Sequence, residues 1–591
     1  MRSTRTGLAC LAGALVALRP APAAAEEAAP ESVTIAYSRY ELAAIHDAER
    51  ALGSEIDAHA EGKIVESIET VRLDPIEKKD PAPLALNAVH VTTKEDVILH
   101  EMLFRVGDRY RKVTADESAR NIRRFMRVSI VAVVPMRGSA PDRVRAVVIT
   151  KDVWSLIADV DFKVSSGGIE HMMLEIEETN LFGRQMELSA HSILQPESVA
   201  VGAAYIAPRF AGRWLSMHAE SNVIINRRSG EPEGSFGDAR IERPLFSTRT
   251  NWSWMTGIFW RDEVYRRYSN AAVAQFEGGV PWVYRARQIH YTAAATRSFG
   301  WARKNDFTIG TTVSRDEYRV PEQPGLDPDL VHRFTREAVP VGEARTVPFV
   351  QWRTYANDFL RIVDFETLAL QEDYRLGYDV VLRGYPITRA FGSTRDLVGV
   401  RAGAVYTVAL GDGFLRALLD TTTEAEAERI ADASINGELR IVSPRTPLGR
   451  LIFDAAATNR WRNYLNRLSF LGGEDRLRGW PTRHFVGKNI AALNVELRTR
   501  PIELSAMQLG GAFFFDSGRA FNGSFEEIRP VHSVGAGFRI VLPQLDRSVI
   551  RGDFGFPVVA GDLPAGVTPM SFFFSFGQAF RATHMTAPFG P

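Results

Sequence analysis

The stretch MSFFFSFGQAF (Met570–Phe580) decides the fold, because its side chains divide onto two unlike faces of an extended strand. Successive residues of a strand point to opposite sides. Serine, glycine and alanine occupy one side, with Phe573 as an exception, and the other side carries five large apolar residues: Met570, Phe572, Phe574, Phe576 and Phe580. On the edge of a soluble sheet such a row would be an aggregation hazard, whereas hydrocarbon favours it. The stretch therefore predicts a membrane-facing strand.

The same alternation recurs upstream, in segments of the length expected for strands that cross a membrane. Ala491–Arg500, Ser533–Leu542 and Ile550–Val558 each place apolar residues at nearly every second position. A soluble β-sandwich also alternates, but a single sheet of well over ten twisted strands tends to close on itself. Roughly 16 to 20 strand-like segments can be marked in this way. We therefore predict an all-β transmembrane barrel.

The N-terminus carries the features of a signal peptide. Arg2 and Arg5 precede the apolar run Gly7–Leu18, and Ala23–Ala25 fits a cleavage site. The run is shorter than the roughly 20 residues that a spanning helix needs. We expect residues 1–25 to be removed on export, and with them Cys10, the single cysteine. A mature chain without cysteine would have neither disulfides nor cysteine-based zinc sites.

Residues 62–153 have the pattern of a small α+β domain. A strand is predicted over Ile64–Leu73 and a helix over Thr93–Phe104. A second helix follows the capping-box pattern TADE (Thr114–Glu117). Two β-branched segments, Val128–Val134 and Val144–Ile149, then read as a hairpin. One face of the second helix is apolar: Ala115, Ala119, Ile122 and Met126.

Three other segments lie outside these patterns. Residues 26–61 contain a predicted amphipathic helix, Tyr40–Asp57, which would either dock on the α+β domain or plug the barrel. Val320–Ala344 is rich in proline and charge and is predicted to be a long loop. Thr422–Ala433 is predicted to be a loop with a short helix.

Four short motifs, together with the α+β pattern of residues 62–153 just before the predicted barrel, carry a family resemblance. In chain order they are EETNLFGR (Glu177–Arg184), LGGEDRLRGWP (Leu471–Pro481), FFFDSG (Phe513–Gly518) and FSFGQAF (Phe574–Phe580). They resemble, respectively, the first periplasmic turn, the lumen loop, the following barrel-wall segment and the C-terminal signal of the BamA/TamA-type superfamily of outer-membrane insertases and translocases. The chain departs from that pattern in two places, since Gln185 replaces the last glycine of the turn motif and residues 581–591 follow the terminal aromatic.

The resemblance implies a fold and a set of working residues. It implies a barrel of about 16 antiparallel strands over 154–580, a single periplasmic POTRA domain over 62–153 and a tail over 581–591. The matched positions are Asn180, Leu181, Phe182 and Gly183 in the turn; Gly472, Gly473, Leu477, Arg478, Gly479 and Trp480 in the lumen loop; Asp516 and Gly518 in the wall segment; and Phe574, Phe576, Gly577 and Phe580 in the C-terminal signal.

In this superfamily the loop arginine folds back into the barrel and pairs with the wall aspartate, which correspond here to Arg478 and Asp516. The strand period agrees, because Asp516 falls on the polar side of its segment, opposite Phe513 and Phe515. A lumen carboxylate needs a partner where water is scarce. The planar guanidinium group can supply two hydrogen bonds to it, so we predict this pair.

A second stretch, LRGYP (Leu382–Pro386), nearly repeats LRGWP (Leu477–Pro481). It has no Gly-Gly lead-in and no matching aspartate, and it ends a strand-like segment. We therefore predict that Arg383 is an ordinary wall residue and that Arg478 is the working arginine.

The resemblance implies a protein that assists the insertion of β-barrel proteins into the outer membrane. Client strands would pair with the barrel edge near Trp154–Val164 and Met570–Phe580, and the POTRA edge strand would collect clients in the same way. The implied partners are outer-membrane lipid, unfolded β-barrel clients, and periplasmic chaperones or accessory lipoproteins. No cofactor or metal is expected. The 71 basic and 71 acidic residues balance, which gives no argument for a nucleic-acid partner.

Three alternatives come from other classes of protein. A translocation pore of the two-partner secretion type, exporting a dedicated substrate, is favoured by the predicted helix before the α+β domain. An outer-membrane protease or phospholipase would need clustered His, Asp and Ser at a strand rim, and the histidines show no paired spacing: His171, His218, His290, His484 and His532. A passive porin would need neither the N-terminal domain nor the LRGW loop.

Overall fold

The computed structural model describes residues 37–580, except 79, 81, 82, 89, 166, 475, 505 and 506. The predicted signal peptide (1–25) and the predicted tail (581–591) lie outside the described residues. Within them, every helix is too short or too polar to cross a membrane.

The segment 62–153 forms a three-stranded sheet with two helices. Its elements are β1 (Ile64–Leu73), α3 (Glu95–His100), α4 (Lys112–Phe125), β2 (Val128–Arg137) and β3 (Arg143–Asp152). The strand order is β1-β3-β2, with β1 parallel and β2 antiparallel to the central β3. The elements therefore follow one another in the predicted order.

Helix α4 buries the predicted apolar face but begins differently. Ala115, Ala119 and Ile122 pack into the core between the sheet and the helices. The helix starts at Lys112, and its N-cap, Arg111, makes no capping bond through its side chain. The predicted capping box is therefore wrong. Glu117 instead accepts hydrogen bonds from the backbone and hydroxyl of Thr248, in a barrel turn.

Helix α2 (Arg39–Leu52) docks on the second face of the sheet. It begins at a capping box formed by Ser38 and Glu41 and ends at Gly53, whose φ of 58° suits glycine. Tyr40, Ala44 and Ile45 pack against β2 and β3 together with apolar residues of two barrel turns, Leu368, Leu370, Val541 and Val549. The sequence left two placements open for this helix, docking on the α+β domain or plugging the barrel, and the helix docks on the domain.

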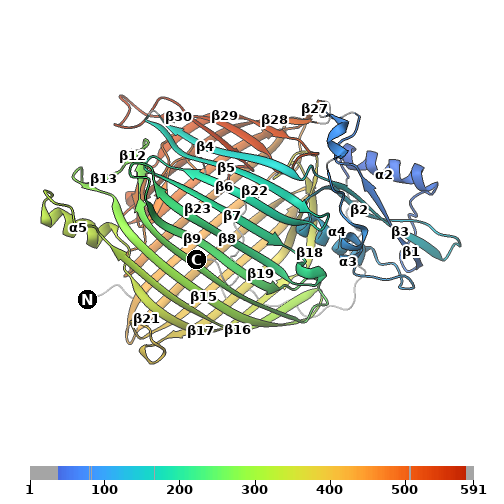
Figure 1. Cartoon of the computed structure of the whole chain (residues 1–591), viewed down its shortest axis with the longest axis horizontal. Coiled ribbons are helices and arrows are strands. Elements are labelled where there is room, and N and C mark those ends of the chain that lie inside the picture. The colour runs from blue at the N-terminus through green and yellow to red at the C-terminus, as the bar shows by residue number, and fades with distance from the viewer. Residues whose placement is uncertain are drawn as a thin grey trace. The chain divides into compact units, whose positions relative to one another are not determined.

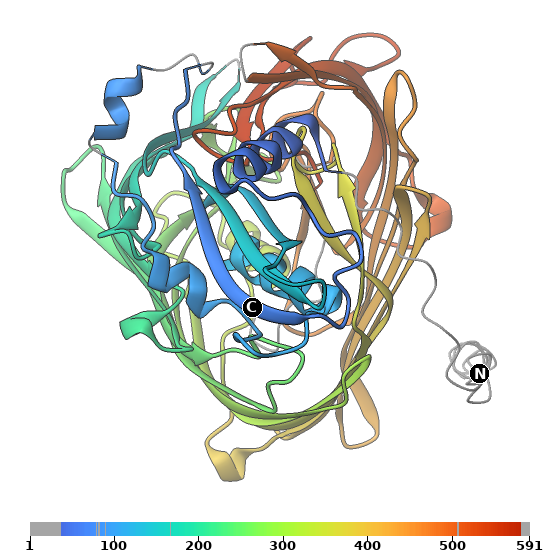
Figure 2. The ribbon, with the colours of Figure 1, turned by 90° about the vertical axis from the view of Figure 1, so that its right-hand side faces the viewer.

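The remaining chain forms a closed antiparallel barrel (Figures 1 and 2). Its strands are β4 (Leu156–Ser165), β5 (Gly168–Leu181), β6 (Met186–Leu194), β7 (Ser198–Ala207), β8 (Ser216–Asn226), β9 (Pro232–Arg243), β10 (Trp252–Arg266), β15 (Val283–Phe299), β16 (Arg303–Arg319), β17 (Glu343–Ala356), β18 (Asp358–Val363), β19 (Gln371–Ile387), β20 (Leu397–Leu410), β21 (Gly413–Glu426), β22 (Arg429–Val442), β23 (Gly449–Asn463), β26 (Asn489–Thr499), β27 (Ile502–Leu504), β28 (Met507–Phe521), β29 (Val531–Val541), β30 (Ile550–Val558) and β31 (Ser571–Phe576).

The described barrel has 20 strands, because β18 continues β17 along β19 and β27 continues β26 along β28. The prediction of about 16 strands, a number taken from the resemblance, is therefore wrong. Thr422–Ala433, predicted to be a loop with a short helix, forms most of the hairpin tip of β21 and β22. Its β-branched Thr422 and Thr423 favour the extended ladder.

The two ends of the barrel carry different structures. At the end that we call near, turns contact the α+β domain, as when Gly183 accepts from the Lys94 amide and Arg547 donates to the Ser129 carbonyl. At the far end lie α5 (Pro328–Ala338) and four short strands (Figure 1): β11 (Tyr268–Ser269), β12 (Ala272–Val273), β13 (Gln275–Phe276) and β14 (Val280–Pro281). Helix α5 lies inside the segment Val320–Ala344, predicted to be a loop, and packs Phe334 against Trp282.

The barrel wall alternates between an apolar outer face and a polar inner face. On β16, Phe307, Ile309 and Val313 are exposed, while Asp306 and Thr308 are buried inside. On β31, the outward positions are Phe572, Phe574 and Phe576, and the exceptional Phe573 is buried. An exposed apolar belt of this kind is suited to hydrocarbon.

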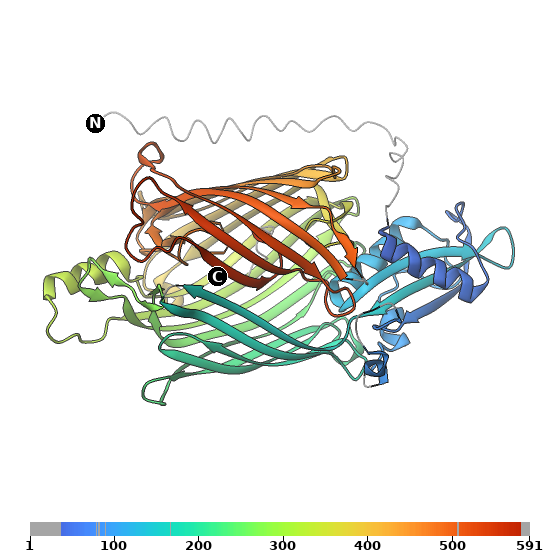
Figure 3. The same cartoon turned by 90° about the horizontal axis from the view of Figure 1, so that it is seen from above.

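The barrel closes through a short seam between its last and first strands (Figure 3). Strand β31 pairs with β4 only over Phe572–Phe574 and Phe162–Val164, whereas its pairing with β30 spans Ser571–Phe576. The predicted last strand continued to Phe580, and this part of the prediction is wrong. At Gly577 a φ of 90° turns the chain off the wall, a conformation that glycine adopts without strain.

Candidate functional site

The LRGW loop lies inside the barrel, between two short strands that form a hairpin, β24 (Ser469–Leu471) and β25 (Phe485–Gly487). Gly472 and Gly473 open the loop with φ values of 122° and 96°. A Cβ added at Gly472 would lie 2.3 Å from the carbonyl oxygen of Pro481, so the tight entry excludes any side chain there. Leu477 and Trp480 are buried, and the indole of Trp480 donates to the carbonyl of His532.

The loop places Arg478 against Asp516 of strand β28. Nε and Nη2 of Arg478 donate to the two carboxylate oxygens, each at 2.9 Å, and the Arg478 amide donates to the same carboxylate at 3.0 Å. Both side chains are fully buried. The predicted pair is therefore present, with the planar two-bond geometry that arginine allows.

Two further carboxylates, which the sequence analysis did not identify, complete the surroundings of Arg478. Its Nη1 donates to Glu496 of β26 at 2.5 Å and to Asp553 of β30 at 3.3 Å. The Asn494 amide donates to Asp516 at 2.8 Å. The alternation in β26 was a usable signal for Glu496, because it places that residue on the same inner face as Asn494. Asp553 lies far from Arg478 in the sequence. The alternation of its strand does not indicate that it contacts Arg478.

Buried arginines and carboxylates gather around the loop, and a partly buried carboxylate, Glu474, contacts Arg551 at 3.3 Å beside them. Arg478, Arg498, Arg539 and Arg551 face three acids, Glu496, Asp516 and Asp553, and all seven side chains are buried. We call this group the ion cluster. Buried charges are costly unless each has partners, so removing one member leaves the others uncompensated.

Glycine lets the loop approach the wall. A Cβ added to Gly555 of β30 would lie 2.1 Å from the Arg478 carbonyl oxygen, and one added to Gly479 would lie 2.5 Å from Ser533 Cβ. Gly518 of β28 similarly leaves space for Leu471, whose Cδ2 would be 3.0 Å from an added Cβ. The loop backbone therefore rests on the wall at positions where side chains are absent.

The C-terminal segment 577–580 reaches the same ion cluster. Gln578 accepts a hydrogen bond from Nε of Arg539 at 2.9 Å, and the Ala579 carbonyl accepts one from Arg498 at 3.3 Å. The Arg478 guanidinium lies between two rings, 3.4 Å from the Phe514 centroid and 5.0 Å from the Phe580 centroid. Of the C-terminal signal residues, Phe574 and Phe576 thus face outward, Gly577 forms the turn and Phe580 lies in the lumen.

The predicted periplasmic turn, Asn180–Gly183, lies at the near end and contacts the α+β domain. The Asn180 side chain donates to the Val91 carbonyl and to the Thr93 hydroxyl, while Leu181 ends β5 and Phe182 is exposed. Gln185, the residue that replaces a glycine, has a φ of 54°. Its side chain donates to Thr93 and accepts from the Arg127 amide, so it adds a link between barrel and domain.

Arg383 lies away from the ion cluster, on the wall strand β19. Its Nε and Nη2 donate to the Gln351 side chain at 3.0 and 2.9 Å, and its guanidinium lies over the Phe349 ring. The structure therefore gives the two LRG stretches different surroundings, as the sequence predicted.

One histidine lies beside carboxylates that its sequence spacing did not reveal. His218 and Glu220 on β8 and Asp238 on β9 place their ligand atoms within 4.8 Å of one another. His218 contacts Asp238 at 3.3 Å, and all three residues are half-buried. A signal existed in the alternation of β8, which places His218 and Glu220 on one face.

Comparison with known proteins gives one related sequence and several similar barrels. No known protein-family profile matches the chain. A putative outer membrane protein assembly factor of Treponema pallidum (strain Nichols) is 25% identical over 173 residues, which is 28% of this chain and 20% of that protein. The chain thus matches about a fifth of the length of this relative.

Several solved structures also align with most of this chain. BamA from Haemophilus ducreyi lacking POTRA domains 1-3 is 12% identical, with 92% of this chain and 94% of that chain covered and a TM-score of 0.33. CdiB from Escherichia coli is 11% identical, with 89% and 80% covered and a TM-score of 0.39. The related assembly factor supports the resemblance of this chain to the BamA/TamA-like superfamily of outer-membrane proteins.

Proposed function

We propose that the protein assists the assembly of β-barrel proteins in the outer membrane, with residues 62–153 acting as a periplasmic POTRA domain. The observation that carries this proposal is the short seam, where the ladder joins β31 to only three residues of β4. A strand edge that is unpaired in lipid is costly, because hydrocarbon supplies no hydrogen bonds. A client strand that paired with the β4 edge would form backbone hydrogen bonds that satisfy both the β4 edge and the edge of the client strand.

The proposed driving force is the burial of the client in lipid. An unfolded barrel strand carries apolar side chains and unpaired backbone groups, and both are satisfied once it joins a closed sheet in the membrane. In this mechanism the ion cluster has a positioning role. It holds the LRGW loop and the end of β31 together, so that the seam has a defined closed state.

Client capture by the α+β domain needs an open strand edge, and the contacts of β2 bear on this part of the proposal. Arg123 donates to the Val131 carbonyl and Arg547 to the Ser129 carbonyl along the outer edge of β2. Further along, the Asp57 amide donates to the Pro135 carbonyl. Capture at β2 would therefore require the release of these groups. Of the three, only Arg547 belongs to the barrel, so movement of the domain away from the near end would free the Ser129 carbonyl.

Depletion of the protein followed by quantitative outer-membrane proteomics tests the proposal. General assembly predicts a fall in many barrel proteins, with the mRNA levels of the same proteins as a control. Loss of a single exported protein, with the barrel proteins unchanged, would instead establish the two-partner secretion alternative. That alternative gained support from the predicted helix before the domain, but α2 packs on the sheet.

A further inference from the structure

A group of arginines gathers on the outer face of the barrel at its far end. Arg285 and Arg287 lie on β15, and Arg315 and Arg319 on the adjacent β16. The two strands pair Arg285 with Arg319 and Arg287 with Glu317, so the group forms one continuous patch. We call these four residues the arginine rim.

The strand period shows that the rim faces outward. On β15 the exposed apolar residues Ile289 and Tyr291 share the odd positions with the two arginines, and on β16 Ile309 and Val313 do the same. Side chains two residues apart lie on one face of a strand. The rim is therefore the continuation of the lipid-facing belt, at the point where apolar side chains give way to charge.

The height of the rim matches the headgroup level of one leaflet. Large aromatic side chains are exposed at the near end of neighbouring strands: Trp252, Trp254, Phe299, Phe307 and Trp352. Interfacial aromatics of this kind mark one boundary of the hydrocarbon layer. From Phe307 to Arg315–Arg319 along β16 is roughly 20–30 Å along the membrane normal, at about 3.3 Å per residue and a tilt of about 40°. That distance is close to the hydrocarbon thickness, so the rim lies in the opposite headgroup layer.

The rim has more positive charge than its own acids neutralise. Asp262 lies between Arg285 and Arg287, at 2.6 and 3.2 Å. Glu317 lies between Arg315 and Arg319, at 2.8 and 3.7 Å. Two carboxylates thus serve four arginines. The Arg287, Arg315 and Arg319 side chains remain 58%, 70% and 77% exposed, which leaves donors available to a ligand.

The patch is also hollowed. Arg285, Arg287, Glu317 and Arg319 line a surface cavity of about 300 Å³. The guanidinium fork matches the oxygens of a phosphate group, to which it can donate two parallel hydrogen bonds. An anion in this cavity would be met by Arg287 and Arg319 from two strands. Arg285 adds positive charge, while its Nη1 and Nη2 donate to the Glu233 carbonyl and to Asp262.

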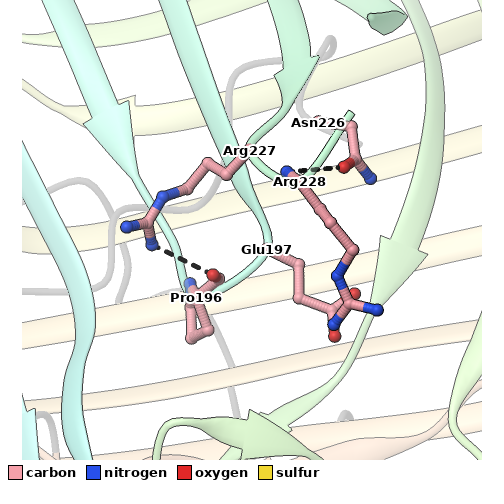
Figure 4. Close-up of a pocket in the computed structure, with 5 residues that line it drawn as sticks. All are labelled: Pro196, Glu197, Asn226, Arg227 and Arg228. Atoms are coloured by element: carbon pink, nitrogen blue, oxygen red, sulfur yellow. Dashed lines mark hydrogen bonds between the residues drawn. The ribbon is translucent and has the colours of Figure 1, made fainter. Parts of the chain in front are cut away.

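A second cavity at the same end shows a different arrangement (Figure 4). It is lined by Pro196, Glu197, Asn226, Arg227 and Arg228. Arg227 donates to the carbonyls of Gln195 and Pro196, so its guanidinium closes its own hairpin turns. An arginine used in this way holds a loop, whereas the rim arginines project from the wall.

We propose that the arginine rim binds the phosphate groups of a lipid in the leaflet remote from the α+β domain. A headgroup with two phosphate groups fits best, because the rim carries two positive charges in excess of its carboxylates. The lipid chains would lie along the apolar belt below, over Ile289, Tyr291 and Val313. This site requires only that the barrel span a membrane, so it is independent of the proposed assembly function.

The test uses the full chain in detergent and three probes: diphosphoryl lipid A, its monophosphoryl form and phosphatidylcholine. Native mass spectrometry measures how much of each lipid the protein retains. We expect retention to rise with the number of phosphate groups. The variant Arg287→Gln/Arg319→Gln should retain diphosphoryl lipid A roughly tenfold less well, because each lost fork removes charge-assisted bonds.

The matched control is Arg389→Gln/Arg395→Gln, which removes two exposed arginines from the turn between β19 and β20 at the same end. It should retain lipid as the parent protein does. The single variant Arg319→Gln serves if the double variant fails to fold, since that side chain is largely exposed. Equal retention by the rim variant and the parent, or equal retention of phosphatidylcholine, would overturn the site. Displacement of the lipid by millimolar inorganic phosphate would overturn the lipid assignment.

Discussion

The guanidinium of Arg478 and the carboxylate of Asp516 meet through two hydrogen bonds of 2.9 Å, with both side chains fully buried. They come from a loop and a wall strand, and their contact fixes the LRGW loop in the lumen. Removing one partner of a buried pair leaves the other charge buried without a partner, and this typically lowers the stability of the protein by about 3–5 kcal/mol.

The Arg478–Asp516 contact predicts strong coupling between the two residues. Arg478→Ala and Asp516→Ala should each destabilise the barrel by about 3–5 kcal/mol, and the double variant should cost clearly less than their sum. Urea unfolding in lipid vesicles measures the three free energies. Additive effects would show that the pair makes no energetic contribution.

The two LRG stretches should respond differently to the same substitution. Arg383→Ala should be well tolerated, because that side chain is only half-buried and contacts the neutral Gln351. Arg478→Ala should impair both barrel stability and the level of client barrels in the outer membrane. Comparable damage from the two variants would contradict the assignment of Arg478 as the working arginine.

Gly555 should tolerate no side chain. In Gly555→Ala the new methyl group would lie 2.1 Å from the Arg478 carbonyl, so the loop must shift. Overpacking of this kind typically costs about 1–3 kcal/mol. Gly384→Ala is the control, since an added Cβ at Gly384 meets no atom within 4 Å. Protection of the loop from proteolysis, compared between the two variants, is the measurement.

Acid should weaken the contact between the α+β domain and the barrel through His100. This residue packs against Trp214 of a near-end turn, with the ring centroids 4.3 Å apart, and burial lowers its pKa below the ordinary value of 6.5. Glu101 and Asp96 oppose this shift, and Arg209 adds to it. Because the folded pKa is depressed, the stabilisation is fully present above pH 6.5 and is lost as pH falls through the folded value.

Hydrogen exchange of α3 between pH 5 and pH 8 measures this effect. In His100→Phe the ring contact with Trp214 is kept and the titration is removed, so the acid-dependent loss of protection from this group should disappear. An unchanged pH profile in that variant would assign the effect to other groups.

The proposed seam opening should be blocked by a covalent link. Val164→Cys/Phe572→Cys joins residues directly opposite each other across the seam, and Ala417→Cys/Leu439→Cys is the matched pair on a continuous ladder. Oxidation of the seam pair should stop client insertion into liposomes, and reduction should restore it. Full activity with the seam pair oxidised would show that the barrel works without opening there.

Much of the wall was predictable from the sequence because strand alternation is a local property. It placed Asp516 inside and Phe513 outside, and it identified Phe573 as an exception. The partners of Arg478 were harder to find. Asp553 becomes a neighbour of Arg478 only when the loop folds across the lumen. The sequence around either residue gives no sign of this contact.

The strand number and the final turn also escaped prediction, for physical reasons. Each strand is compatible with barrels of several sizes, since closure depends on the sum of all ladders. At the C-terminus, Phe580 continues the apolar period of β31, but the φ of Gly577 takes it into the lumen. The alternation shows which side chains would share a face if the strand continued. The backbone conformation of Gly577 determines that the strand ends there.

That inward turn makes the seam and the lumen loop thermodynamically linked. Strand β31 and the segment that contacts Arg498 and Arg539 are one continuous piece of chain, joined at Gly577. If β31 leaves β4 only after this segment dissociates from the ion cluster, any change that strengthens this contact by a given factor must lower the population of the open seam by the same factor. The opening equilibrium of the barrel would then be set by residues that do not touch the seam.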